Sequence, residues 1–213
     1  MSSSRFPGKM LAPFLGKPLI SSVVERIARA VPASQLILAT STDASDDPLA
    51  NYVEKCLGLA VYRGELENVF ARFQGCLRTY PCDWFVRISG DSPVIDGDLI
   101  AHMLTLVNGG SDIVTNVATR TFPPGQSVEI LRTEPFMAID EDALDADDWA
   151  HVTLPYYRAN SPFRMVRVVS RIPALAERRM VVDSIDDLRA MEALLRSSPA
   201  ETGGFADLAV VQT

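Results

Sequence analysis

Short apolar segments alternate with amphipathic ones along the first 117 residues, and this alternation limits the fold more than any other feature of the sequence. The segment 35–40 is apolar and bounded by polar residues, which is typical of a strand buried on both faces. The segment 18–30 before it repeats apolar residues at helical spacing. The same pattern recurs with helices at 48–57, 67–80 and 98–108 and strands at 59–63, 84–88 and 112–117. The alternation predicts an α/β fold, in which helices cover both faces of a mostly parallel sheet.

The regular alternation stops at residue 118. Segment 118–162 combines a turn-rich link with a possible strand at 127–131 and a stretch, 140–148, in which six of nine residues are acidic. We expect an irregular insert whose acidic stretch is a solvated loop. An insert of this kind after the main sheet serves as a substrate lid, a dimerisation arm or plain surface, and the sequence favours none of the three.

The final third of the chain returns to the earlier pattern. Strands are predicted at 165–169 and 180–182, and Ser184 is placed to cap a helix in which apolar residues recur at helical spacing. The length of 213 residues suits one domain, 1–213, large enough to bury a substantial core.

Charge and composition exclude several classes of function. The formal net charge of -7 argues against nucleic acid or an anionic membrane surface as the main partner, because both require clustered cations. The sequence has neither an apolar run long enough to span a bilayer nor a signal peptide, so we expect a cytoplasmic protein. Its three cysteines lack metal-ligand spacing and predict neither a disulfide framework nor a zinc site.

Basic residues gather at the N-terminus of this acidic chain. The first 24 residues contain Arg5, Lys9 and Lys17 and no acid. Around them, segment 2–9 supplies hydroxyls and a Pro-Gly turn that brings backbone N–H groups close to a ligand. This pattern suits a polyphosphate, although it is neither a P-loop nor a dinucleotide fingerprint. The alternative is a solvated N-terminal loop.

Two aspartates follow predicted strands directly. Asp91 comes after the strand 84–88, and Asp183 comes after 180–182. The carboxyl ends of parallel strands form the edge of an open sheet at which ligands bind. Mg²⁺ takes one or two carboxylates, keeps several waters and bridges to phosphates, so the two aspartates are candidates for one shared ion. The alternative for each is to cap the next helix.

Eight motifs, in order, resemble the spore-coat polysaccharide branch of the acylneuraminate and CMP-Kdo cytidylyltransferases, and the match covers nearly the whole chain. The motifs are Ser4-Arg-Phe-Pro-Gly-Lys9, Gly16-Lys-Pro-Leu19, Ala39-Thr-Ser-Thr42 with Asp46-Asp-Pro48, Tyr62-Arg-Gly64, Arg87-Ile-Ser-Gly-Asp-Ser-Pro-Val-Ile95, Arg120-Thr-Phe-Pro123, His151-Val-Thr153 and Val181-Val-Asp-Ser-Ile-Asp-Asp-Leu188.

The resemblance implies a Rossmann-like nucleotidyltransferase fold of the GT-A type. It also implies that a sugar-acid hydroxyl attacks the α-phosphate of CTP and expels pyrophosphate, mainly by alignment and charge neutralisation. The residues it assigns are Arg5 and Lys9 on the triphosphate, Ser4, Thr40, Ser41, Arg63 and Ser89 around the nucleotide, and Asp91 and Asp183 on Mg²⁺, with Asp91 counted as catalytic together with the two cations.

Three departures from the family pattern bear on these expectations. Members of the family open with a buried strand and an arginine just before the position of Met1, so either the given sequence starts late or the sheet lacks its central strand. Ala150 and Ser127 stand where the family has acidic residues, in the region 118–162 expected to bind the acceptor and to form a homodimer. These departures leave open a non-catalytic nucleotide-binding protein. The fold class also leaves open a glycosyltransferase that uses a nucleotide sugar, although Asp91-Ser-Pro93 lacks the Asp-x-Asp step usual in the metal site of such enzymes.

Overall fold

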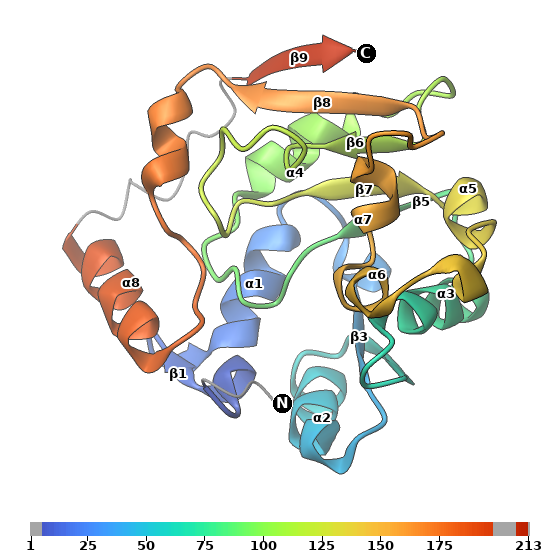
Figure 1. The fold of residues 1–213 in the computed structure, drawn as a ribbon. Coiled ribbons are helices and arrows are strands. Elements are labelled where there is room, and N and C mark those ends of the chain that lie inside the picture. The colour runs from blue at the N-terminus through green and yellow to red at the C-terminus, as the bar shows by residue number, and fades with distance from the viewer. Residues whose placement is uncertain (1–5, 198–207, 213) are drawn as a thin grey trace.

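The predicted alternation of helices and strands is present in the computed structural model, which describes residues 6–197 and 208–212 (Figure 1). The strands are β1 (Pro13–Phe14), β2 (Lys17–Pro18), β3 (Ile37–Ser41), β4 (Ala60–Gly64), β5 (Trp84–Arg87), β6 (Ile113–Thr115), β7 (Glu129–Arg132), β8 (Met165–Ser170) and β9 (Leu208–Gln212). The α-helices are α1 (Leu19–Ile27), α2 (Asp47–Cys56), α3 (Val69–Thr79), α4 (Gly97–Leu104), α5 (Thr133–Met137), α6 (Ala146–His151), α7 (Leu154–Tyr157) and α8 (Ile185–Ser197). Short 3₁₀ helices connect them: η1 (Lys9–Leu11), η2 (Ala33–Gln35), η3 (Ala44–Asp46), η4 (Glu141–Ala143) and η5 (Pro173–Glu177).

Five strands form one mixed sheet in the order β5-β7-β6-β8-β9, and β3 pairs in parallel with β4 in a separate two-stranded sheet. In the larger sheet β7 is antiparallel to both β5 and β6, and β8 is parallel to β6. Strands β5, β6 and β8 therefore share one direction, as the alternation predicts. The two antiparallel strands, β7 and β9, come from segments outside the regular alternation.

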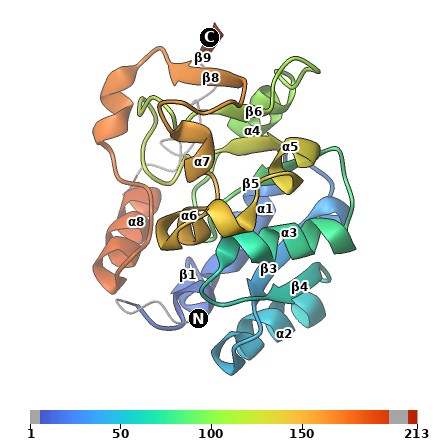
Figure 2. The ribbon, with the colours of Figure 1, turned by 45° about the vertical axis from the view of Figure 1, so that its right-hand side comes forward.

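Successive residues of the sheet face two different hydrophobic cores. On β6, Val114 belongs to the core under α1, α2, α4 and α8, whereas its neighbour Ile113 belongs to the core under α3, α5 and α7. On β7, Ile130 and Leu131 divide in the same way, because adjacent side chains of a strand point to opposite faces. Helices thus cover both faces of the sheet, and the expected α/β class is confirmed (Figure 2).

The predicted strand at 180–182 is wrong. The segment is extended, but its backbone N–H groups bond to loops and not to a neighbouring strand: Met180 N–H donates to the carbonyl of Pro124, and Val182 N–H to that of Asp91. Gly125, at φ +100°, permits the close approach, because a Cβ there would lie 2.1 Å from the Met180 carbonyl oxygen. This pairing of loops brings the chain just before Asp183 against Asp91.

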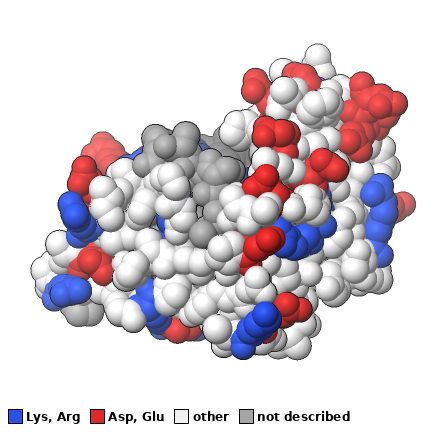
Figure 3. Space-filling view, turned by 90° about the horizontal axis from the view of Figure 1, so that it is seen from below, with Lys and Arg blue, Asp and Glu red and all other residues white. Residues whose placement is uncertain are grey.

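The acidic stretch 140–148 is not a loop throughout. It contains η4 and the start of α6, where the side chains of Asp145 and Asp148 each accept from the other's backbone N–H in a capping box. Most of the stretch is exposed, but Asp148 is buried and paired with Arg158. Figure 3 shows acidic side chains gathered in one corner of the face that it presents, with the basic ones scattered.

Segment 118–162 is also less irregular than expected. It supplies β7, which lies between β5 and β6 in the larger sheet, together with α5, α6 and α7. Its roles in acceptor binding and dimerisation stay predictions. Among the described residues, none of the helices combines the length and the apolar character that crossing a bilayer requires.

Candidate functional site

Lys9, Asp91 and Asp183 meet in one cluster, although they come from three distant parts of the chain. The Lys9 ammonium donates to Asp91 Oδ2 at 3.5 Å, to Asp183 Oδ1 at 3.4 Å and to the carbonyl oxygen of Val182 at 3.0 Å. The Lys9 side chain is 12% exposed, and the two carboxylates are 23% and 21% exposed. The cluster is therefore partly screened from water while still open on one side.

Local structure explains how each member reaches the cluster. Gly8, in the left-handed conformation at φ 74°, turns the chain into η1, so that Lys9 begins this helix. Asp91 lies in the loop after β5, whose Gly90 packs against the side chain of Met10 in η1. Asp183 follows the segment whose Val182 N–H bonds to the Asp91 carbonyl at 2.9 Å. The loops of Asp91 and Asp183 are thus joined by a backbone hydrogen bond, and the side chains of Met10 and Lys9 hold η1 against them.

Neither aspartate caps the helix that follows it. Asp96 is the N-cap of α4, where its side chain accepts from the backbone N–H of Asp98. At the start of α8, Ser184 and Asp187 cap the helix reciprocally, as predicted for Ser184. The Asp183 carboxylate instead accepts from Lys9 and from Arg179 at 2.6 Å. The capping alternative is excluded for both.

The donor set of this cluster fits a small divalent cation. Two carboxylates already converge on one positive charge, the Lys9 ammonium, which stands where an ion bound to both would lie. Two carboxylates plus water and phosphate oxygens match the preference of Mg²⁺. In residues 6–197 and 208–212 no group of three or more His, Cys, Asp or Glu side chains is arranged to hold a metal, so a protein-only cage is not the arrangement here.

A second cluster lies at the carboxyl ends of β3 and β4, where Thr40 pairs in register with Arg63. The hydroxyls of Thr40 and Ser41 both donate to Asp46 Oδ2 at 2.6 Å. Arg63 donates to the carbonyl oxygens of Ser41 and Asp43 and forms an ion pair with Asp47. These contacts fix the loop between β3 and α2, and the nucleotide-binding role of the three residues stays a prediction.

The remaining predicted site residues divide into two groups. Ser89 is exposed in the loop between β5 and Asp91, two positions before that aspartate. Ser4 and Arg5 lie outside the described residues. The structure therefore brings together Lys9, Asp91 and Asp183 from the predicted set and places Ser89 in the Asp91 loop.

A buried polar network went unpredicted. Glu129, 2% exposed at the start of β7, accepts from Arg87 at 2.5 Å and from the hydroxyl of Tyr157 at 2.6 Å. The same hydroxyl lies 2.8 Å from Thr115 Oγ1. Burial raises the pKa of Tyr157 well above its usual range, and the neighbouring Glu129 carboxylate adds to the rise. Arg87 belongs to the Asp91 motif, but Glu129 lies 42 positions away from it. The spacing of the two residues in sequence therefore gave no sign of the network.

We expect Tyr157→Phe to lower the free energy of unfolding by about 1–3 kcal/mol, because it leaves one oxygen of buried Glu129 without its donor. Thermal unfolding measures the effect. Tyr80→Phe is the matched control, since the Tyr80 hydroxyl makes no hydrogen bond to any residue that the structure describes, and it should unfold like the unmodified chain. Equal melting temperatures for the two variants would contradict the assigned network.

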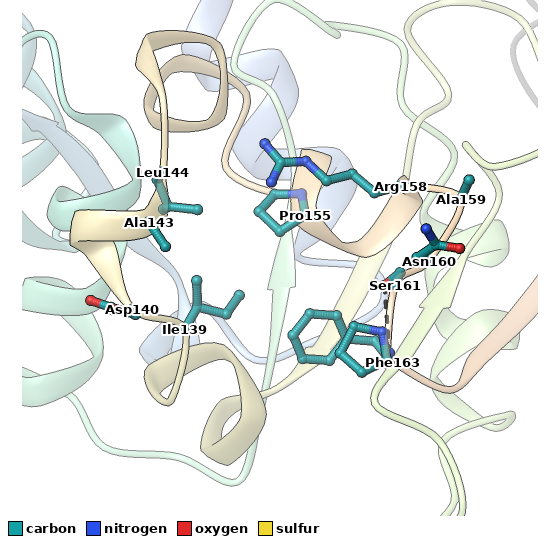
Figure 4. A pocket seen from close by; sticks show the side chains of 11 residues that line it. Ile139, Asp140, Ala143, Leu144, Pro155, Arg158, Ala159, Asn160, Ser161 and Phe163 are labelled. Atoms are coloured by element: carbon teal, nitrogen blue, oxygen red, sulfur yellow. Dashed lines mark hydrogen bonds between the residues drawn. The ribbon is translucent and has the colours of Figure 1, made fainter.

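Two hollows lie beside α7, away from the Lys9 cluster. The first, of about 450 Å³, has Ile139, Leu144 and Pro155 on its walls (Figure 4). The second, of about 420 Å³, lies against β8 and is lined in part by Tyr157 and Arg167. The segment 158–163 contributes to both walls. Neither hollow is lined by Lys9, Asp91 or Asp183.

Comparisons with known proteins agree on one family. The sequence model of the family described as Cytidylyltransferase matches residues 1–195. The spore coat polysaccharide biosynthesis protein SpsF of Bacillus subtilis (strain 168) is 27% identical over 208 residues, which cover 93% of this chain and 84% of that protein. The 3-deoxy-manno-octulosonate cytidylyltransferase of Anaeromyxobacter sp. (strain K) is 30% identical over 215 residues, which cover 94% and 85%.

Solved structures extend the likeness to the fold. A cytidylyltransferase from Leptospira borgpetersenii serovar Hardjo-bovis (strain JB197) superimposes with a TM-score of 0.88 at 23% identity, covering 97% of this chain and 87% of that one. CMP:2-keto-3-deoxy-manno-octonic acid synthetase complexed with CTP superimposes with a TM-score of 0.67 at 17% identity, covering 92% and 95%. At these identities the structures show a shared nucleotidyltransferase fold.

Proposed function

Because the chain belongs to the cytidylyltransferase family, a class of CTP-dependent nucleotidyltransferases, we propose that it transfers CMP from CTP to a sugar acid and releases pyrophosphate. The observation that carries this proposal is the meeting of Asp91 and Asp183 at the Lys9 ammonium. The two carboxylates suit a divalent metal ion, and the Lys9 ammonium suits a triphosphate. A nucleotidyl transfer requires both.

In this proposal, Asp91 and Asp183 hold Mg²⁺, while Lys9 and Arg5 bind the triphosphate. The ion, when bound, would neutralise phosphate charge and orient the triphosphate. Ser4, Thr40, Ser41, Arg63 and Ser89 surround the rest of the nucleotide. The side chains position the α-phosphate for in-line attack by the acceptor hydroxyl, whose oxygen forms the new P–O bond as the bond to pyrophosphate breaks. No side chain acts as a nucleophile.

The acceptor assignment is a nonulosonic or related keto-sugar acid destined for a surface polysaccharide. It is supported by the similarity to SpsF and to the 3-deoxy-manno-octulosonate enzyme. We further propose that segment 118–162 contributes to acceptor binding and to a homodimer, in a cytoplasmic enzyme. Sedimentation of the purified protein tests the dimer.

Release of pyrophosphate from a panel of nucleotides tests the proposed reaction. The protein is incubated with Mg²⁺, each of the four NTPs and a set of sugar acids that includes 3-deoxy-manno-octulosonate. We expect release only with CTP plus an acid, and the CMP ester should appear in equal amount. Release from another NTP would refute the nucleotide assignment. Tight binding of CTP without turnover on any acid would instead favour the non-catalytic alternative.

A further inference from the structure

Arg167 in β8 is a half-buried cation without a counter-ion. Its side chain makes no ion pair or hydrogen bond with any residue in the described ranges 6–197 and 208–212, and its Nε is fully buried without a partner. A buried charged group that lacks a hydrogen-bonding partner costs free energy, so such groups are normally paired. A half-buried arginine in this state is available to bind an anion from outside the chain.

Arg167 ends a row of polar side chains that crosses the sheet. Arg87 of β5 pairs in register with Glu129 of β7, Glu129 with Thr115 of β6, and Thr115 with Arg167. Register partners project from the same face, so these four residues, the polar row, lie side by side. With strands about 4.8 Å apart, the row spans about 14 Å. Glu129 already bonds to Arg87, which leaves the charge of Arg167 uncompensated.

The second hollow beside α7, of about 420 Å³, gives an anion access to Arg167. Arg158 also lines it, but its guanidinium is already paired with Asp148 and Asp145. Tyr156, another lining residue and only 1% exposed, has a buried hydroxyl without a hydrogen-bond partner among the described residues. The Tyr156 hydroxyl has almost no exposed surface, so the unpaired guanidinium of Arg167 is the group at this hollow that suits a small anion with several acceptor oxygens.

The polar row runs from this hollow to the strand that leads into the Asp91 loop. Its first residue, Arg87, stands four positions before Asp91, at the end of the strand that leads into the Asp91 loop. Tyr157 lines the hollow and bonds to both Glu129 and Thr115 in the middle of the row. An acceptor anchored by its acid group at Arg167 therefore lies on the same face of the sheet as the network that holds Arg87.

We propose that Arg167 anchors the carboxylate of the sugar-acid acceptor in the hollow between α7 and β8. This inference rests on the proposed function, because it assigns the acceptor of that reaction. It names a residue outside the eight sequence motifs, and it gives an anionic partner to the guanidinium of Arg167, whose side chain makes no ion pair with any described residue. A guanidinium is suited to the planar carboxylate because its donors match the two oxygens.

The test compares Arg167→Met and Arg167→Lys with Arg189→Met, a control on the surface of α8 whose side chain is 71% exposed. We expect Arg167→Met to raise the KM for the acid by about 10- to 100-fold, the loss of one charge-assisted contact, while the KM for CTP stays unchanged. Arg167→Lys should recover part of the loss. The melting temperature of Arg167→Met should not fall, because the substitution removes a half-buried cation that makes no ion pair with any described residue.

A binding experiment without CTP separates this inference from the proposed function. Calorimetry measures 3-deoxy-manno-octulosonate, its methyl ester and inorganic phosphate against each variant. We expect the acid to bind the unmodified chain, and the ester and the Arg167→Met variant to lose that binding. The carboxylate assignment is overturned if the ester binds as well as the acid. It is also overturned if phosphate binds where the acid does not and Arg167→Met abolishes that phosphate binding. If acid binding depends on Arg167 but no CMP ester forms, the inference survives and the proposed reaction fails.

Discussion

Replacement of Asp91 or Asp183 by alanine is expected to abolish turnover, with the rate of pyrophosphate release falling by at least about a thousandfold. Both carboxylates reach the same cation position, now held by the Lys9 ammonium at 3.5 and 3.4 Å. Loss of either carboxylate leaves the ion with a single protein ligand. It also removes one of the two negative charges that pair with Lys9. Release of pyrophosphate from CTP in the presence of an acceptor measures the effect.

Asp186→Ala is the matched control for Asp183→Ala. Asp186 lies in the first turn of α8, three positions from Asp183, and its side chain is 89% exposed. It should turn over at the normal rate. The double variant, Asp91→Ala with Asp183→Ala, should be no slower than either single variant, because residues that act as one unit are not additive. Substantial activity in either single variant, with normal unfolding, would refute the shared-ion arrangement.

The sequence predicted the elements that obey its alternation, because each has a periodicity of its own. Strands β3, β4, β5 and β6 and the helices between them fall close to the predicted positions. Periodicity does not specify pairing partners, so the placement of β7 between β5 and β6 was not predictable. The segment 180–182 has the composition of a strand, yet its N–H groups bond to two loops. Local sequence cannot distinguish a strand from an extended segment of that kind.

In the candidate site, too, local sequence patterns were predictable and contacts between distant segments were not. The sequence predicted Asp91 and Asp183 as metal ligands because each follows an apolar segment and the motif resemblance assigns both, and the structure brings the two side chains to Lys9. The bonds of Thr40 and Ser41 to Asp46 were not predicted. The polar row was invisible for a different reason, since it exists only through the register of four strands. Residues that a fold brings together by register carry no common spacing in sequence.

Lys9→Met is expected to have opposite effects on turnover and on metal binding. The Lys9 ammonium lies between the two carboxylates, so a divalent cation must compete with it for the same oxygens. Removal of a unit charge within 4 Å should tighten the binding of Mn²⁺ alone by at least about tenfold. Turnover should nevertheless fall by about a hundredfold, because the triphosphate loses a cation. Titration of Mn²⁺ by electron paramagnetic resonance, without nucleotide, measures the first effect.

Lys17→Met is the control for this prediction, because Lys17 belongs to the same N-terminal basic segment but pairs with exposed Glu25 instead of the two aspartates. Its Mn²⁺ affinity and turnover should match those of the unmodified chain. In Asp91→Asn one of the two carboxylates for which Lys9 and the ion compete is gone. Adding Lys9→Met to this variant should therefore restore little Mn²⁺ binding. An unchanged or weaker Mn²⁺ affinity in Lys9→Met would mean that the ion does not use the position of the ammonium. In the unmodified chain, displacement of Lys9 from the aspartates frees it for a triphosphate, so CTP should strengthen Mn²⁺ binding by offering the ammonium another anion.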